Sequence, residues 1–231
     1  MLSCASVKGN KPYNTKGLFN QKDLSGNFLL TREAGFSPNK SEFIVKGQLE
    51  MDKQVMEKLI SISDIEKKLL EPKVSQFSVW INKKKNFSEI SRDKMGNQLI
   101  LRLISPDPKN DGIKFYPLPE DSKNLCFFSQ VIECARFYGF LDRINDGKET
   151  YKLNVIWDGY PFFHQLLENF PPKLLSPGTL VFDGKNALGN RRFILKVEGE
   201  EIIFELDSQD KILKRIWISK GVTIEKINDT L

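Results

Sequence analysis

Residues with reactive side chains are few in this chain, and none falls in a recognisable catalytic spacing. Its one histidine, His164, follows Phe162 and Phe163, and no pattern in the sequence supplies a nucleophile or a second acid for it. Patterns for a nucleophile elbow, a zinc-protease helix, a P-loop and a dinucleotide-binding turn are absent. We therefore expect no enzymatic activity and no cofactor, with a structural role for His164.

Cys126 and Cys134 stand eight residues apart in an apolar stretch. On a helix they would share a face but lie about 12 Å apart along its axis, which exceeds the reach of a disulfide. We expect two small core residues. No CxxC pair or Cys/His metal spacing occurs.

Acidic residues gather in one proline-rich stretch: Asp107, Asp111, Glu120 and Asp121. Their oxygens could hold Ca²⁺ weakly, but the spacing of an EF-hand is missing. We expect a solvated connection and no metal site.

The third cysteine, Cys4, has a more suggestive setting. Leu2-Ser3-Cys4 resembles the end of a bacterial lipoprotein signal, in which an apolar and a small residue precede the lipidated cysteine. The polar residues 5–22 resemble the tether of such a protein. If Met1 is an internal start, or the chain was trimmed, the upstream piece would be the signal. The alternative is an ordinary floppy N-terminus with one cysteine.

The composition is that of a folded protein, with 40% hydrophobic and 28% charged residues and 17 phenylalanines for a core. The net charge of +5 is spread along the chain, so we expect a mixed-charge surface and no nucleic-acid partner. Residues 83–85, three lysines, fit a hairpin tip better than a phosphate patch. No apolar run is long enough for a transmembrane helix.

Two segments predict helices. Residues 52–70 carry Val55, Met56, Leu59 and Ile60 at helical spacing. Ser63 and Glu66 form a capping-box pattern, so we expect a second, short helix that starts there and ends before Pro72. Residues 123–138 carry the longest apolar stripe, between a cap at Ser122 and Gly139.

Most of the remaining chain predicts strands. We expect strands at positions 27–32, 43–51, 77–81, 87–90, 99–103, 113–116 and 151–157, with apolar residues alternating in the segments 77–81, 99–103 and 151–157 and at Leu49 and Met51. After a proline loop come further strands at 179–182, 193–197, 202–206, 212–218 and 222–227. Asp-Gly, Glu-Gly and Lys-Gly turns separate several of them, as in an antiparallel meander.

The last part of this meander carries a family resemblance. Residues 204–207, the strand at 211–218 and a final strand ending at Ile227 resemble, in pattern, the LolA/LolB-like half-barrel proteins of the bacterial envelope. The resemblance covers about the last hundred residues and carries over no ligand residues. It implies a strongly bent sheet that wraps around helices.

Together these observations predict an α+β protein: a tether at residues 1–22 and one domain at residues 23–231. That domain would be a bent antiparallel meander packed on one long helix and one or two short ones. We expect a non-enzymatic envelope lipoprotein, anchored in a membrane through lipidated Cys4, that binds an apolar or acyl ligand. The alternative is a structural or interaction protein with a filled core, cytoplasmic if Met1 is the true start. The oligomeric state is not predicted.

Overall fold

The computed structural model describes residues 13–23, 26–120, 122–143, 150–162 and 170–227. One sheet of 15 strands runs through these residues in the order β8-β7-β6-β5-β4-β3-β2-β1-β15-β14-β13-β12-β11-β10-β9. Every neighbouring pair is antiparallel except β9 and β10. The chain thus forms two meanders, and β1 joins them by pairing with β15 as well as with β2.

The first meander comprises β1 (Thr15–Asp23), β2 (Gly26–Phe36), β3 (Glu42–Met51), β4 (Gln54–Glu66), β5 (Leu69–Ile81), β6 (Lys84–Asp93), β7 (Gln98–Ile104) and β8 (Gly112–Pro117). The second comprises β9 (Leu125–Phe127), β10 (Thr150–Ile156), β11 (Leu175–Lys185), β12 (Arg191–Val197), β13 (Glu200–Leu206), β14 (Ile212–Trp217) and β15 (Val222–Lys226). Between β9 and β10 lie the 3-10 turn η2 (Phe128–Gln130) and the helix α1 (Val131–Phe137). Two further 3-10 turns are η1 (Pro108–Asn110) and η3 (Ile218–Lys220).

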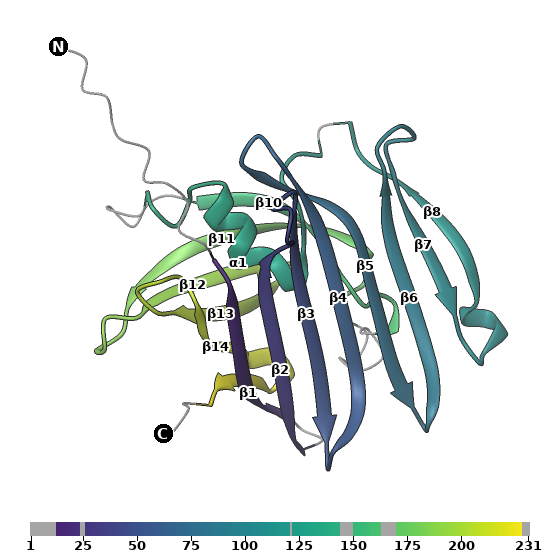
Figure 1. Cartoon of the computed structure of the whole chain (residues 1–231), viewed down its shortest axis with the longest axis horizontal. Helices are drawn as coiled ribbons and strands as arrows, with labels where there is room; N and C mark the ends of the chain where they lie inside the picture. The colour runs from purple at the N-terminus through teal and green to yellow at the C-terminus, as the bar shows by residue number, and fades with distance from the viewer. Residues whose placement is uncertain (1–12, 24–25, 121, 144–149, 163–169, 228–231) are drawn as a thin grey trace.

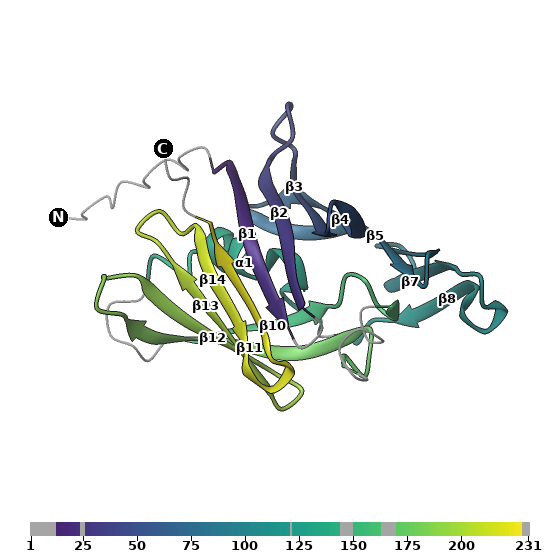
Figure 2. The same cartoon turned by 90° about the horizontal axis from the view of Figure 1, so that it is seen from below.

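The sheet curls without closing, and α1 lies inside the curl (Figures 1 and 2). Strands β8 and β9 end the strand order, and the β9–β10 end packs under β5–β7. Phe77, Leu101 and Phe127 belong to the core formed there. A larger core surrounds α1 and includes Trp157 and Phe193. The predicted bent antiparallel sheet is confirmed.

The predicted helix at residues 52–70 is wrong, because this segment forms β4, a tight turn and the start of β5. A β-bulge leaves Met56 as an extra residue between the pairs Glu57–Leu49 and Val55–Glu50, which breaks the two-residue alternation. Further along β4, the inward positions are Ser61 and Ser63, both fully buried. The proposed capping box does not form.

The predicted long helix at residues 123–138 is also wrong. Its first part is strand β9, followed by the 3-10 turn η2, and only Val131–Phe137 is α-helical. The apolar stripe is buried as expected, but Leu125, Cys126 and Phe127 are buried on both sides as a strand. An apolar run buried on both sides has no period that distinguishes strand from helix.

The predicted tether at residues 1–22 is wrong for the part that the structure describes. Tyr13 is buried, and Thr15–Asp23 form β1 near the middle of the sheet order. The predicted domain boundary at residue 23 therefore falls at the end of an integral strand. Residues 1–12 lie outside the described residues. None of the described helices is long and apolar enough to cross a membrane.

A candidate ligand cavity inside the curled sheet

The concave side of the sheet holds a cavity of about 460 Å³. This volume lies within the range of small-molecule sites in proteins. Both meanders and the η2–α1 segment contribute to its wall, which is mostly apolar. Among the apolar residues that line it are Phe19, Val45, Leu49, Val79, Trp217 and Ile224.

Charged side chains interrupt this apolar wall: Asp23, Arg32, Glu57, Asp158, Arg215 and Lys220. Most of them have partners within the protein. Asp23 accepts hydrogen bonds from the Gly26 amide and the Gln21 side chain. Lys220 Nζ lies 3.7 Å from Glu200 Oε1 and 5.5 Å from the centre of the Phe170 ring.

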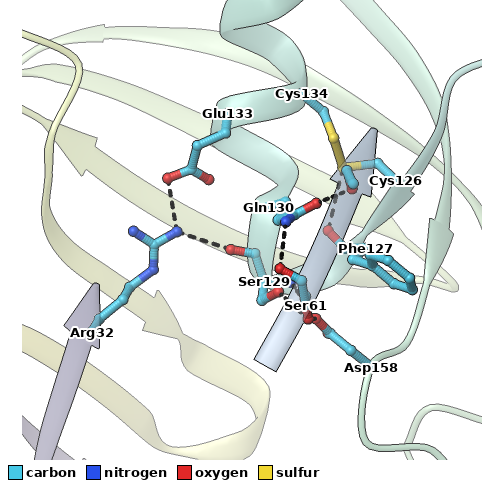
Figure 3. Close-up of a disulfide and its surroundings, with 10 residues drawn as sticks. Arg32, Ser61, Cys126, Phe127, Ser129, Gln130, Glu133, Cys134 and Asp158 are labelled. Carbon is cyan, nitrogen blue, oxygen red and sulfur yellow. Dashed lines mark hydrogen bonds and ion pairs between the residues drawn. A yellow bond between two sulfur atoms is a disulfide. The ribbon is translucent and has the colours of Figure 1, made fainter. Parts of the chain in front are cut away.

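Asp158 is the centre of a buried polar cluster beside the cavity (Figure 3). The Ser61 hydroxyl donates to Asp158 Oδ2 over 2.8 Å, and the Ser129 amide donates to both carboxylate oxygens over 3.2 Å. Burial raises the pKa of Asp158, and these hydrogen bonds oppose the rise. The Gln130 amide adds a bond of 3.0 Å to the Ser61 carbonyl. The cluster fixes the η2 turn to β4.

Arg32 ties β2 to η2 and α1 next to this cluster (Figure 3). Its Nη2 lies 2.8 Å from Glu133 Oε1 and donates to the Ser129 carbonyl over 2.9 Å. Although burial works against the charge, the Glu133 carboxylate raises the pKa of Arg32. The Tyr13 hydroxyl also donates to Glu133 Oε1, and burial and the Glu133 charge raise the pKa of Tyr13. The positive charge of Arg32 is therefore neutralised by Glu133 within the protein.

Arg215 and Glu57 differ from the other charged residues of the wall. Within the described part of the chain, neither makes a hydrogen bond or an ion pair. The Arg215 guanidinium carbon lies 5.3 Å from the centre of the Phe128 ring. Burial lowers the pKa of Arg215 to about 10 and raises that of Glu57 to about 7. Arg215 consequently stays charged at neutral pH, whereas Glu57 is partly protonated there.

The structure joins Cys126 and Cys134 in a disulfide, so the expectation of two unlinked core residues is wrong. Their Cα atoms are 6.4 Å apart, because the chain between them turns from β9 through η2 into α1 instead of running along one helix. The bond lies near the Gln130 side chain, on the side of α1 away from the Glu133–Arg32 pair (Figure 3). It fastens α1 to the last strand of the sheet order.

The other residues singled out in the sequence do not gather at the cavity. Cys4 and His164 lie outside the described residues. Asp107 caps η1 by accepting from the Lys109 amide, and Asp111 accepts from the Ser105 amide. The described residues hold no cluster of three or more metal-binding side chains. Asn82 and Lys83 form the β5–β6 hairpin tip that the lysine run predicted.

The sequence reasoning missed the charged residues of the cavity wall, although a signal for them exists. Arg215 is two residues from the buried Trp217 on β14, and Arg32 is two residues from the buried Ala34 on β2, so each arginine faces the same side of the sheet as a buried residue. A charge at an inward position of a strand marks either an internal ion pair or a polar site in a cavity.

Comparison with known proteins supports the fold alone. No protein-family model and no curated protein sequence matches the chain. A solved structure, that of a β-barrel-like protein of the domain of unknown function DUF1849 from Brucella abortus, is similar with a TM-score of 0.52 and 10% sequence identity. The match covers 94% of this chain and 97% of that one. The chain therefore has a β-barrel-like fold, a likeness that extends neither to the LolA/LolB-like family nor to a lipid anchor.

Proposed function

We propose that this chain is a non-enzymatic binding protein of the bacterial envelope, which holds an apolar or acyl ligand in the cavity of its curled sheet. The observation that carries the proposal is the cavity itself, of about 460 Å³ and with a mostly apolar wall. Native cores are close-packed, with few voids larger than a water molecule. An apolar hollow of this size is typical of a ligand site.

The Cys126–Cys134 disulfide supports the location. Disulfides persist in oxidising compartments, including the bacterial periplasm, and are rare in the cytosol. The lipid anchor at Cys4 belongs to the same proposal and rests on its lipoprotein-like sequence setting. Expression with the natural upstream region, followed by detergent fractionation, tests it. We expect the protein in the membrane fraction and the Cys4→Ala variant released from it. Recovery of unlipidated wild-type protein in the cytosol would remove both location and anchor.

Ligand binding is tested with the uncharged dye N-phenyl-1-naphthylamine, whose fluorescence rises in apolar surroundings. The blocking variant is Gly47→Phe. Gly47 lines the cavity on β3, and a Cβ there would meet only Leu59 Cβ, at 3.7 Å, so a larger side chain can grow into the hollow. The matched control is Lys46→Phe, which places the same ring on the exposed face of β3.

We expect saturable dye binding by the wild type, a loss of about tenfold or more in affinity for Gly47→Phe, and no loss for Lys46→Phe. A tenfold loss corresponds to about 1.4 kcal/mol. No saturable binding, or an equal response from all three proteins, would contradict the proposal.

One feature favours the alternative, a protein that interacts through its surface. Strand β8 ends the sheet order and leaves Ile113 and Phe115 59% and 60% exposed, beside Ile104 of β7, 49% exposed. Exposed apolar edge strands invite pairing with another chain. If this alternative holds, replacing Ile113 and Phe115 with serine will abolish association seen by analytical ultracentrifugation, and the dye will not bind the cavity.

A further inference from the structure

Arg215 occupies a position that an apolar residue would fill in an ordinary core. It lies on β14 directly between Phe204 of β13 and Ile224 of β15 in the sheet register. Both neighbours are 3% exposed and line the same cavity. The row continues through Phe193 of β12, which is fully buried. The guanidinium is therefore set among buried apolar side chains.

The other cations of the wall are already neutralised, whereas Arg215 is not. Arg32 is committed to Glu133 and to the Ser129 carbonyl, and Lys220 lies near Glu200. Arg215 makes neither an ion pair nor a hydrogen bond within the described part of the chain. Arg215 is half-buried, so its charge is partly removed from water, which is unfavourable without a partner. Such a residue indicates a counter-charge that comes from outside the protein.

Of the three carboxylates in the wall, Asp23 accepts hydrogen bonds from Gln21 and Gly26, and only Glu57 and Asp158 act on the charge of Arg215. Neither of these two forms an ion pair with it. Asp158 is occupied by the Ser61 hydroxyl and the Ser129 amide. Glu57, on β4, forms no ion pair with Arg215, and its pKa of about 7 leaves it only partly ionised at neutral pH. Arg32 adds a second positive charge, which lowers the pKa of Arg215 further. Glu57 and Asp158 thus favour the charge of Arg215 from a distance, but no carboxylate of the described residues is bonded directly to its guanidinium.

A guanidinium presents a planar fork of donors that matches the paired oxygens of a carboxylate or a phosphate. In this cavity, the apolar wall formed by Phe19, Leu49 and Val79 is available to a hydrocarbon chain. We propose that the cavity selects amphiphiles with an anionic headgroup, a carboxylate or a phosphate monoester, and that Arg215 binds this headgroup. The inference rests on the proposed function, because it assigns a chemical class to the ligand of the same cavity.

A headgroup series with one chain length tests it. Bound N-phenyl-1-naphthylamine is displaced by dodecanoate, dodecyl phosphate, dodecanol or dodecyltrimethylammonium, each below its micelle concentration. The proteins compared are the wild type, Arg215→Met and Arg215→Lys. The matched control is Lys214→Met, which removes a charge from the neighbouring position on the outer side of β14, where Lys214 pairs with Glu225. Circular dichroism checks that each variant is folded.

For the wild type, we expect at least one of the two anions to displace the dye at a concentration about tenfold lower than dodecanol, since a hydrogen bond to a charged group contributes about this much. Arg215→Met should remove the preference, Arg215→Lys should keep most of it, and Lys214→Met should leave it unchanged. The order of dodecanoate and dodecyl phosphate identifies which anion the site prefers.

Dodecanol displacing the dye from the wild type as well as both anions do would overturn the inference while leaving the proposed function intact. So would a preference for anions that survives in Arg215→Met. An absence of dye binding to the wild type would overturn both. The wild-type headgroup series decides the question even if Arg215→Met fails to fold.

Discussion

Cys126 and Cys134 are covalently joined across the bend between β9 and α1. Strand β9 has only Leu125–Phe127 and pairs in parallel with β10 at one end of the strand order. Helix α1 has seven residues, which is too short to be stable by itself in water. The disulfide thus holds together two short elements against which the polar cluster around Asp158 is built.

Replacing both cysteines with alanine should lower the free energy of unfolding by about 2 to 3 kcal/mol, since a short closed loop restricts the unfolded chain by about this amount. Urea denaturation followed by Trp fluorescence measures the change. A reducing agent should destabilise the wild type by a similar amount and leave the double variant unaffected. Equal stability of wild type and variant without reductant would show that the bond adds nothing.

Glu133→Ala should be strongly destabilising. Arg32, whose side chain is 14% exposed, would lose the fully buried carboxylate of Glu133, at a cost of about 3 to 5 kcal/mol. Replacing the pair together, as Arg32→Met with Glu133→Leu, should recover most of this loss, because no unpaired charge remains. Denaturant unfolding of the two single variants and the double variant gives the coupling.

The matched control for this pair is the neighbouring residue Glu33, which points to the opposite face of β2 and pairs with exposed Lys16. Glu33→Ala should leave the unfolding midpoint unchanged, as is usual for surface ion pairs. A large loss of stability in Glu33→Ala, or a small loss in Glu133→Ala, would mean that burial does not determine how much these ion pairs contribute to stability.

Glu57→Gln should stabilise the protein above pH 7 and have little effect near pH 4.5. Burial raises the pKa of Glu57 from 4.5 to about 7. The folded state therefore holds this proton more tightly than the unfolded state does. The stability contributed by the protonated form is fully present below pH 4.5 and is lost as the pH rises to 7.

Above pH 7 the variant should be more stable than the wild type by about 1 to 3 kcal/mol, reduced by whatever water the cavity admits. Urea unfolding midpoints at pH 4.5, 6 and 8 give the difference in stability between wild type and Glu57→Gln. Because both proteins contain the same other titratable groups, the contributions of those groups cancel in this difference. A difference that stays constant with pH would contradict the raised pKa.

The sequence predicts the strands of the second meander well, for local reasons. Phe193, Leu195 and Val197 occupy every second position of β12, and a Glu-Gly turn follows them. Such patterns are sufficient because each strand pairs with the next one along the chain. In β4, by contrast, the bulge at Met56 and the buried serines hide the alternation.

The cavity was predicted only as a general expectation for a bent sheet, and its charged residues were not predicted at all. Glu57 and Arg215 line the same space from β4 and β14, which are far apart in the chain. Their proximity depends on how far the sheet curls, a property that no local pattern determines. The disulfide was missed for a related reason. A continuous helix over residues 123–138 would separate Cys126 and Cys134 too widely, whereas the observed bend brings their Cα atoms to 6.4 Å.

The turn after β4 provides the last prediction. Lys67 and Lys68 link Glu66 to Leu69 as a two-residue hairpin loop and have φ angles of 48° and 66°. Side chains other than Gly and Asn adopt this left-handed region at a cost of about 1 kcal/mol per residue. Replacing Lys67 with Asn and Lys68 with Gly should therefore raise the free energy of unfolding by about 1 kcal/mol, measured by urea denaturation. Lys68→Ala, which removes a charge but keeps the strain, should bring no gain. If Lys68→Ala stabilises the protein as much as the double change, charge repulsion between the lysines and not backbone strain limits this turn.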